Sequence, residues 1–320
     1  MASVIATILN SEYFSNRPPV LIDIGASGAI NAKWKAIAPY SICIAFDADD
    51  REFNVSASTS SGYKKLITIN RIVSATPVQQ AAFYLTASPF CSSLLEPAFD
   101  KLAPWSFQSL FATNKKIELP ATTIAAALQQ AGVDYIDWFK TDTQGTDLRL
   151  FLSVPDAVKQ QILAAELEPG ILDAYHGEDK LYSILEILPQ HQFWLSSMEV
   201  KGTQRLKEAL VSQAGRLTAS RGLRKSPGWA ELCFLKQPVQ KGKRELLLLY
   251  VFALIEKQYG FAIEVMDAAL QQYDDAIFTQ CRQQAFALLK KQQWKIPVVM
   301  IKKQLQKLYT KLGIADYSAG

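Results

Sequence analysis

The feature that most constrains the fold is an apolar run that ends in an acid and a glycine turn, at residues 20–28 (VLIDIGASG). Short apolar runs without alternation are typical of parallel strands that are buried on both faces. Asp23 and the turn from Gly25 to Gly28 would then lie at the edge of the sheet where open α/β folds bind ligands. The segment alone is equally compatible with a simple turn after a buried strand, so its interpretation depends on the neighbouring strands.

A second apolar run, residues 42–46 (ICIAF), is followed by Asp47, where nucleoside-binding sheets place an acid for the ribose hydroxyls. The two runs indicate an adenosine cofactor, but Ser27 and Ile30 replace the second and third glycines of the dinucleotide pattern. This disfavours an NAD-dependent oxidoreductase, and S-adenosylmethionine, whose sulfonium and ammonium are positive, suits Asp23 better. The expected cofactor contacts are Asp23, Gly25, Ala26, Ser27, Gly28, Asp47, Ala48, Ser74 and Asp142.

Two later strands would bring further acids to the same edge. Residues 134–145 (DYIDWFKTDTQG) and 162–168 (ILAAELE) both end in polar groups. Strand alternation places Lys140 with Asp142, and Glu166 with Glu168, on one face, so we expect three carboxylates to converge on a cleft. The candidate proton acceptors are Asp142, Glu166, Glu168 and His176, although a loop histidine is also common as a plain surface group.

These segments resemble those of the FkbM-type S-adenosylmethionine-dependent methyltransferases. The matching stretches are VLIDIGASG, AFDADDREF, CSSLLEP, DWFKTDTQGTDL and AAELEPGILDAYHG, in the family's order and spacing, across residues 20 to about 235. The family usually has an acidic residue and proline where Asp47 and Ala48 stand, and often glutamate where Gln144 stands. The resemblance implies a Rossmann-like sheet and methyl transfer to oxygen, with the segment around His176 facing the acceptor.

Further candidate acceptor contacts come from two other segments. Ser92 and Ser93 lie in a matching stretch, and the resemblance places them across the site from the carboxylates; alternatively they cap a helix. Residues 201–228 carry seven basic side chains and a single acid, Glu208. Such a segment is commonly a solvated loop, and the alternative is a clamp for phosphate or carboxylate on the acceptor. The clamp would consist of Arg221, Arg224 and Lys225.

The composition agrees with a cytoplasmic enzyme of ordinary core content. The chain has 320 residues, of which 49% are apolar, and its net charge of +4 disfavours a nucleic-acid partner. Its four cysteines form no CxxC pair, which indicates buried thiols in a reduced compartment and no metal site. Residues 1–14 lack the basic start of a secretory signal and are expected to form an amphipathic helix.

We expect a doubly wound, mostly parallel α/β sheet in residues 1–240, closed by an antiparallel pair at 193–200 and 229–235, and a helical extension in residues 241–320. A third strand is expected at 66–74 and a short one at 82–86, with a helix that begins after Thr122 or Thr123 and runs to Ala131.

The helical extension contains two distinctive stretches. The apolar run 246–255 is too short to span a bilayer and indicates a buried helix. Residues 282–311 carry eight basic side chains and no acid. This part would either contact an anionic membrane or a partner protein, or present a solvated face.

The sequence therefore predicts an S-adenosylmethionine-dependent O-methyltransferase that acts on a hydroxyl of a sugar, glycoconjugate or related natural product. The oxygen acceptor rests on the resemblance, because the residues themselves do not separate oxygen from nitrogen acceptors. A non-catalytic ligand-binding or assembly module built on the same fold is the alternative. Calorimetry with S-adenosylmethionine and S-adenosylhomocysteine would distinguish the two.

Overall fold

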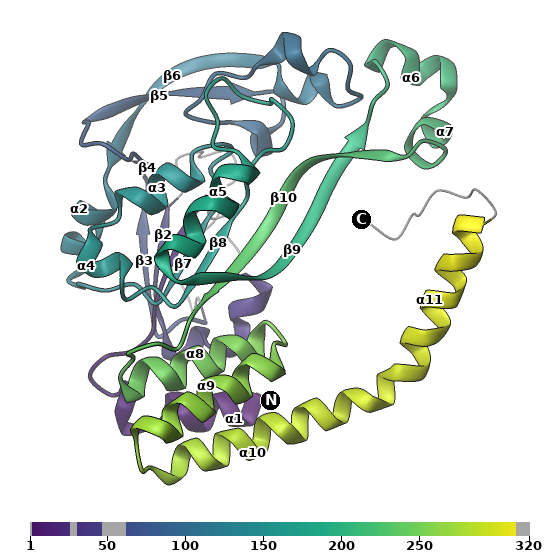
Figure 1. Ribbon diagram of the computed structural model, residues 1–320. Coiled ribbons are helices and arrows are strands. Elements are labelled where there is room, and N and C mark those ends of the chain that lie inside the picture. The colour runs from purple at the N-terminus through teal and green to yellow at the C-terminus, as the bar shows by residue number, and fades with distance from the viewer. Residues whose placement is uncertain (1, 26–30, 47–61, 312–320) are drawn as a thin grey trace.

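A computed structural model describes residues 2–25, 31–46 and 62–311 of the chain (Figure 1). Its centre is a 7-stranded sheet in the order β3-β2-β1-β7-β8-β10-β9. The parallel part consists of β1 (Val20–Ile24), β2 (Ile42–Phe46), β3 (Lys65–Ile69), β7 (Trp138–Thr141) and β8 (Ala164–Leu167). The long strands β9 (Phe193–Gln204) and β10 (Lys225–Lys236) close the sheet as an antiparallel hairpin. The expected Rossmann-like α/β fold is confirmed.

Alternating side chains of the central strands pack into two separate hydrophobic cores, one on each face of the sheet. Val20 and Ile22 of β1 pack with α2 (Ile124–Ala131) and α3 (Asp147–Ser153), together with part of α5 (Leu181–Ile187). Leu21, Cys43 and Trp138 face the opposite side and pack with α1 (Ala2–Leu9) and the C-terminal helices. A short helix, α4 (Asp156–Lys159), precedes β8. Because both faces are covered, the strands are apolar throughout, as the sequence indicates.

A second, 3-stranded sheet lies above the carboxyl ends of the central strands (Figure 1). It consists of β4 (Ile72–Val73), β5 (Gln80–Thr86) and β6 (Thr113–Thr122), in the order β4-β6-β5. The strand expected at 66–74 is confirmed only in its first part, as β3, because the chain leaves the central sheet after Ile69 and β4 pairs with β6 instead. The short strand is confirmed, and Thr123 caps α2 by accepting a hydrogen bond from the Ala126 amide at 3.2 Å.

The C-terminal helices are α8 (Lys243–Ile255), α9 (Tyr259–Gln272), α10 (Ala276–Lys291) and α11 (Ile296–Lys311). Every residue of α8 from Leu246 to Leu254 is fully buried, which confirms the buried helix. The ring of Phe252 meets that of Trp138 edge-on, with centroids 4.6 Å apart. One apolar core therefore joins residues 241–285 to the sheet. All four cysteines are free and buried, as expected.

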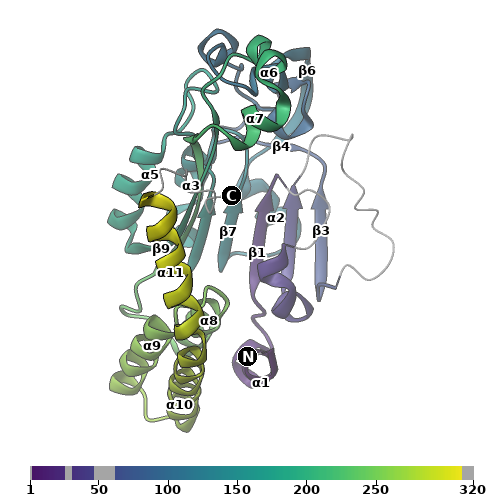
Figure 2. The same cartoon turned by 90° about the vertical axis from the view of Figure 1, so that its right-hand side faces the viewer.

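A buried ion pair fastens α8 to the amino-terminal end of the sheet. The Arg244 guanidinium donates to both carboxylate oxygens of Asp137, at 2.9 and 2.8 Å, and to the carbonyl oxygens of Arg17 and Pro18. Asp137 also accepts a hydrogen bond from the Val20 amide at 2.9 Å, at the first residue of β1. By contrast, α11 projects away from the body of the molecule (Figures 1 and 2).

Candidate functional site

A cavity of about 630 Å³ lies between the central sheet and the second sheet, at the carboxyl ends of β1, β2, β7 and β8. Its size is in the usual range for a small-molecule site. The walls are largely apolar and aromatic, and four acids open onto the space. The aromatic lining residues are Phe46, Phe83, Phe90, Phe107, Phe111, Tyr175 and Trp229, and the acids are Asp142, Glu168, Glu178 and Glu231.

The wall formed by β1 and β7 requires a glycine at its edge. Gly25 has a φ of +83°, and a Cβ there would lie 2.1 Å from the carbonyl oxygen of Asp142. The Gly25 amide donates to the Phe46 carbonyl at 3.0 Å, so the ends of three neighbouring strands meet at this residue. Bare backbone at Gly25, the aromatic side chain of Phe46 and the carboxylate of Asp142 thus border one part of the cavity.

Asp23 and Lys140 form an ion pair beneath this wall. The two residues are neighbours in register, and Lys140 Nζ lies 2.6 Å from Asp23 Oδ1. Burial alone would lower the pKa of Lys140, but Asp23 and Asp142 raise it above its ordinary value. Lys140 lines the cavity and Asp23 does not. Asp23, expected as a cofactor contact, thus adjoins the cavity only through its ion pair with Lys140.

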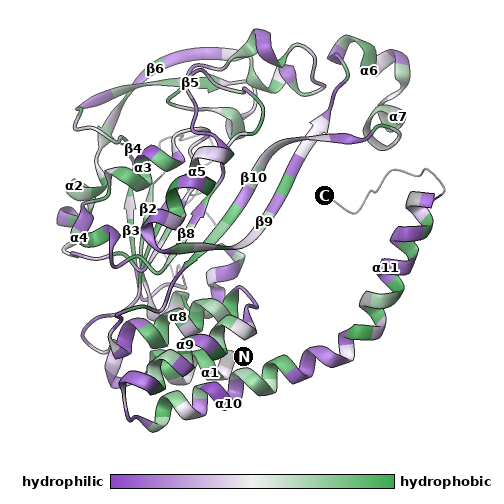
Figure 3. Cartoon of the chain, viewed as in Figure 1, coloured by the Kyte–Doolittle hydropathy of each residue, from purple (hydrophilic) through white to green (hydrophobic). Residues whose placement is uncertain are grey.

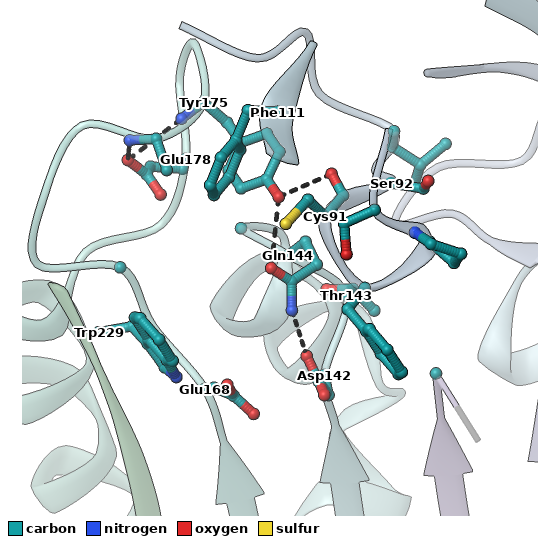
Figure 4. A pocket seen from close by; sticks show the side chains of 18 of the residues that line it. Cys91, Ser92, Phe111, Asp142, Thr143, Gln144, Glu168, Tyr175, Glu178 and Trp229 are labelled. Atoms are coloured by element: carbon teal, nitrogen blue, oxygen red, sulfur yellow. Dashed lines mark hydrogen bonds between the residues drawn. The ribbon is translucent and has the colours of Figure 1, made fainter. Parts of the chain in front are cut away.

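The turn after β7 presents a chain of side-chain hydrogen bonds to the cavity (Figure 4). Gln144 Nε2 donates to Asp142 Oδ1 at 2.7 Å, and Tyr175 donates to Gln144 Oε1 at 3.3 Å and to the Cys91 carbonyl at 2.8 Å. Gln144 has a positive φ of 56°, and Gly145 follows with a φ of +111°. The strained turn thus aims the amide of Gln144 at Asp142 and fixes one carboxylate oxygen.

Glu168 faces the cavity near Asp142 and Trp229 (Figure 4). Burial and the nearby charges of Asp142 and Glu231 raise the pKa of Glu168 from 4.5 to about 9. Asp147, fully buried in the first turn of α3, has its pKa raised to about 8 by burial and by Asp142. The convergence of acids expected from the strand ends is present for Asp142 and Glu168. The raised pKa of Glu168 means that its carboxyl group retains a proton to higher pH than an ordinary carboxyl group.

Glu166 lies outside the cavity, contrary to expectation. Its Oε2 is 3.1 Å from Lys33 Nζ, which also binds Glu256 at 3.1 Å. Burial raises the pKa of Glu166, and Lys33 opposes this effect. The reason is the position of each residue along the strand. Glu166 lies within β8, where it pairs with Cys233 of β10, whereas Glu168 comes just after the strand ends at Leu167. Two residues on one face of a strand can thus lie in different environments.

His176 is exposed and does not line the cavity, so the structure does not support it as the proton acceptor. The backbone amide of His176 donates a hydrogen bond to the backbone carbonyl of Glu96. The preceding residue, Tyr175, is buried and lines the cavity (Figure 4). Glu178 fixes this loop by accepting from the Ala174 amide at 2.7 Å and from Lys180 at 2.6 Å. The sequence patterns do not single out Tyr175 and Glu178, although both lie in or beside a stretch that carries the family resemblance.

The two serines lie in the loop between β5 and β6, and only Ser92 lines the cavity. Ser92 lines it and accepts a hydrogen bond from the Thr86 amide at 3.2 Å. Ser93 donates to the Gln144 carbonyl at 2.8 Å and so supports the turn from behind. Ser74, expected near adenine, accepts from the Thr76 amide and does not line the cavity; its neighbours Ile72 and Val73 do. The reason is that β4 has left the central sheet.

The clamp residues of the basic segment that the structure describes, Arg224 and Lys225, lie away from the cavity. The hairpin strands are longer than expected, so that Lys225 already belongs to β10 and pairs with Gln204. The tip carries α6 (Glu208–Ala214) and α7 (Arg216–Arg221), and it projects beyond the sheet (Figure 1). Arg224 and Lys225 are exposed and do not line the cavity, so these two residues do not form the expected clamp there. The side chain of Arg221 lies outside the described part, as do the predicted cofactor contacts Ala26, Ser27, Gly28, Asp47 and Ala48.

Among the described residues, no group of three or more histidine, cysteine, aspartate or glutamate side chains is arranged to hold a metal ion.

No family model matches the chain, and no curated protein matches it. Among solved structures, the chain is similar to an uncharacterized protein from Listeria monocytogenes serotype 4b. The likeness covers 90% of this chain and 96% of that chain, with 11% sequence identity and a TM-score of 0.30. A TM-score of this size supports no inference, so only the chemistry of the cavity bears on the function.

Proposed function

We propose that the protein is an S-adenosylmethionine-dependent O-methyltransferase of the FkbM type that acts on a hydroxyl of a sugar, glycoconjugate or related natural product. The observation that carries this proposal is the cavity at the carboxyl ends of β1, β2, β7 and β8, where the glycine turn at Gly25 and the acids Asp142 and Glu168 border one space. Open α/β sheets bind their ligands at this edge.

Bound S-adenosylmethionine would supply a methyl group on a sulfonium, activated for in-line displacement. The protein then has to orient an acceptor and receive its proton. Phe46 and the backbone at Gly25 would border the nucleoside, and Asp142 would lie near the positive charge. Gln144 keeps Asp142 in one orientation through the 2.7 Å hydrogen bond.

Glu168 is the proposed proton acceptor. It faces the cavity beside Trp229, and its raised pKa of about 9 makes it a stronger base than an ordinary carboxylate. The positive charge of bound S-adenosylmethionine would lower the pKa of Glu168 toward neutral pH, and Glu168 would then be available as a carboxylate to accept the proton. Aromatic side chains line the cavity beside this group, which would suit an acceptor whose ring stacks on them next to the reacting hydroxyl.

The deciding experiment is calorimetric titration of the full chain with S-adenosylmethionine and S-adenosylhomocysteine. The proposal expects both to bind, with Gly25→Val abolishing binding because its Cβ would collide with Asp142. Gly132→Val is the matched control, since Gly132 also has a positive φ but a Cβ there meets nothing within 4 Å. Binding without methyl transfer to any hydroxylated acceptor would favour the non-catalytic module. Absence of binding to either compound would refute the cofactor.

A further inference from the structure

The helix α11 presents an apolar stripe to solvent along its whole length. Val298, Ile301, Leu305 and Leu308 recur at helical spacing and are 68%, 60%, 46% and 52% exposed. Trp294, just before the helix, is 87% exposed. Apolar side chains that are exposed together in this way mark a surface that contacts a membrane or another molecule. Figure 3 shows the alternation of hydrophobic and hydrophilic residues along α11.

Lysines lie on both sides of this stripe. Lys302 and Lys311 fall at its edges by helical spacing, and Lys303 and Lys307 lie on the opposite face, all of them exposed. From Arg282 to Lys311 the chain carries eight basic residues and no acid. Two such helices would repel one another, since a self-pairing coiled coil needs opposite charges beside its seam. The charge instead complements a uniformly anionic surface.

A second element on the same side of the molecule has the same character. In both views α6 and α7, at the tip of the long hairpin, lie on the side from which α11 projects (Figures 1 and 2). Leu210, Leu217 and Leu223 at this tip are 41%, 67% and 39% exposed. Arg224 and Lys225 beside them are exposed as well. The tip therefore repeats the combination of apolar and basic side chains.

We propose that α11 lies in the interface of an anionic lipid bilayer, with its apolar stripe among the acyl chains and its lysines at the headgroups. A marked apolar stripe beside a lysine-rich polar face, in a helix that is not apolar all round, is typical of interfacial helices. Lysine stems follow the apolar surface while the ammonium stays in water, and a tryptophan at the helix start anchors it at the headgroup level. Within the described residues no helix is long and apolar enough to cross a bilayer.

The test is flotation of the full chain with vesicles of phosphatidylcholine alone and of phosphatidylcholine mixed with phosphatidylglycerol. Binding is expected only to the mixed vesicles and should weaken as salt is raised. Replacing Lys302, Lys303, Lys307 and Lys311 by glutamine should weaken partitioning by at least about a hundredfold. The matched control replaces the exposed lysines Lys35, Lys64, Lys65 and Lys115, which removes the same charge elsewhere, and should leave partitioning close to wild type.

A spectroscopic readout locates the contact. The chain has six tryptophans, so the fluorescence change attributable to Trp294 is the difference between the wild type and Trp294→Phe. A blue shift on mixed vesicles that disappears in Trp294→Phe supports insertion of the helix start. Equal binding to both kinds of vesicle, unchanged binding of the lysine variant, or self-association in sedimentation that Ile301→Ser and Leu305→Ser abolish would each overturn the proposal.

Discussion

The side-chain amide of Gln144 donates a 2.7 Å hydrogen bond to the carboxylate of Asp142 and itself accepts from Tyr175. An amide can donate to a carboxylate, whereas a glutamate in its place would face Asp142 with a like charge. The identity of residue 144 therefore sets how much negative charge this side of the cavity carries.

We expect Gln144→Glu to move the acid limb of the pH–rate profile to higher pH. Two adjacent carboxylates raise the pKa of at least one of them, so the new pair would lose its second proton at a higher pH than an isolated carboxyl group. Initial rates between pH 5 and 9 measure the shift, with Gln79→Glu as the same change on an exposed loop. An unchanged profile in Gln144→Glu would mean that Asp142 does not influence the reaction.

Glu168→Gln should lower kcat by roughly 10² to 10⁴-fold while the affinity for S-adenosylmethionine stays close to wild type, because a general base acts in the transition state. Glu166→Gln is the informative companion, since Glu166 is engaged by Lys33 outside the cavity. Its kcat should stay within a few-fold of wild type. If the two variants lose the same amount of turnover, proton removal by Glu168 is wrong.

The free energy of unfolding should fall as pH rises through the range in which Asp147 is protonated in the folded state but ionised in the unfolded state. Burial raises the pKa of Asp147 from 3.8 to about 8, so the folded chain holds a proton that the unfolded chain has released. Between about pH 4 and pH 8 this site reduces the free energy of unfolding by up to about 1.4 kcal/mol per pH unit. Asp147→Asn should flatten that slope in urea titrations at pH 5, 6, 7 and 8. Parallel curves for wild type and variant would contradict the assignment.

Arg244→Met should destabilise the protein by about 3 to 5 kcal/mol, since it leaves the Asp137 carboxylate buried without its cation. The double variant Arg244→Met, Asp137→Leu should recover part of the loss. Arg282→Met removes a guanidinium from the exposed pair with Asp267 and should cost less than about 1 kcal/mol. Denaturant unfolding measures all three. Equal losses for Arg244→Met and Arg282→Met would show that the buried pair is not what fastens α8.

Replacing Arg224 and Lys225 by serine should leave the acceptor KM unchanged, because neither side chain lines the cavity. Steady-state kinetics with varied acceptor provide the measurement. A KM raised tenfold or more would restore the clamp that the basic segment suggests, and would require the hairpin tip to approach the cavity in the complex.

The sequence predicts the sheet well because strand position follows from apolar runs. Every expected central strand has its counterpart, and the one expected at 66–74 is shorter than predicted because β3 ends at Ile69. The same reasoning predicts the face of a side chain but not its depth, which is why Glu166 and Glu168 are alike in pattern and yet lie in separate places. The alternation of side chains along a strand also cannot predict which residues of a loop face the cavity. Tyr175 and His176 differ in exposure because Glu178 fixes the loop, and that contact depends on residues that fold together only in three dimensions.

The packing of Trp138 against Phe252 has a consequence for the order in which the molecule is made. Translation delivers β7 long before α8, so one face of the sheet is covered only by N-terminal segments such as α1 until more than three quarters of the chain has been synthesised. Nascent chains with apolar surface exposed for that long are prone to aggregate. A chain cut anywhere before α8 would leave Leu21, Trp138 and their neighbours facing water, so truncation in this region should yield insoluble protein and not a smaller folded enzyme.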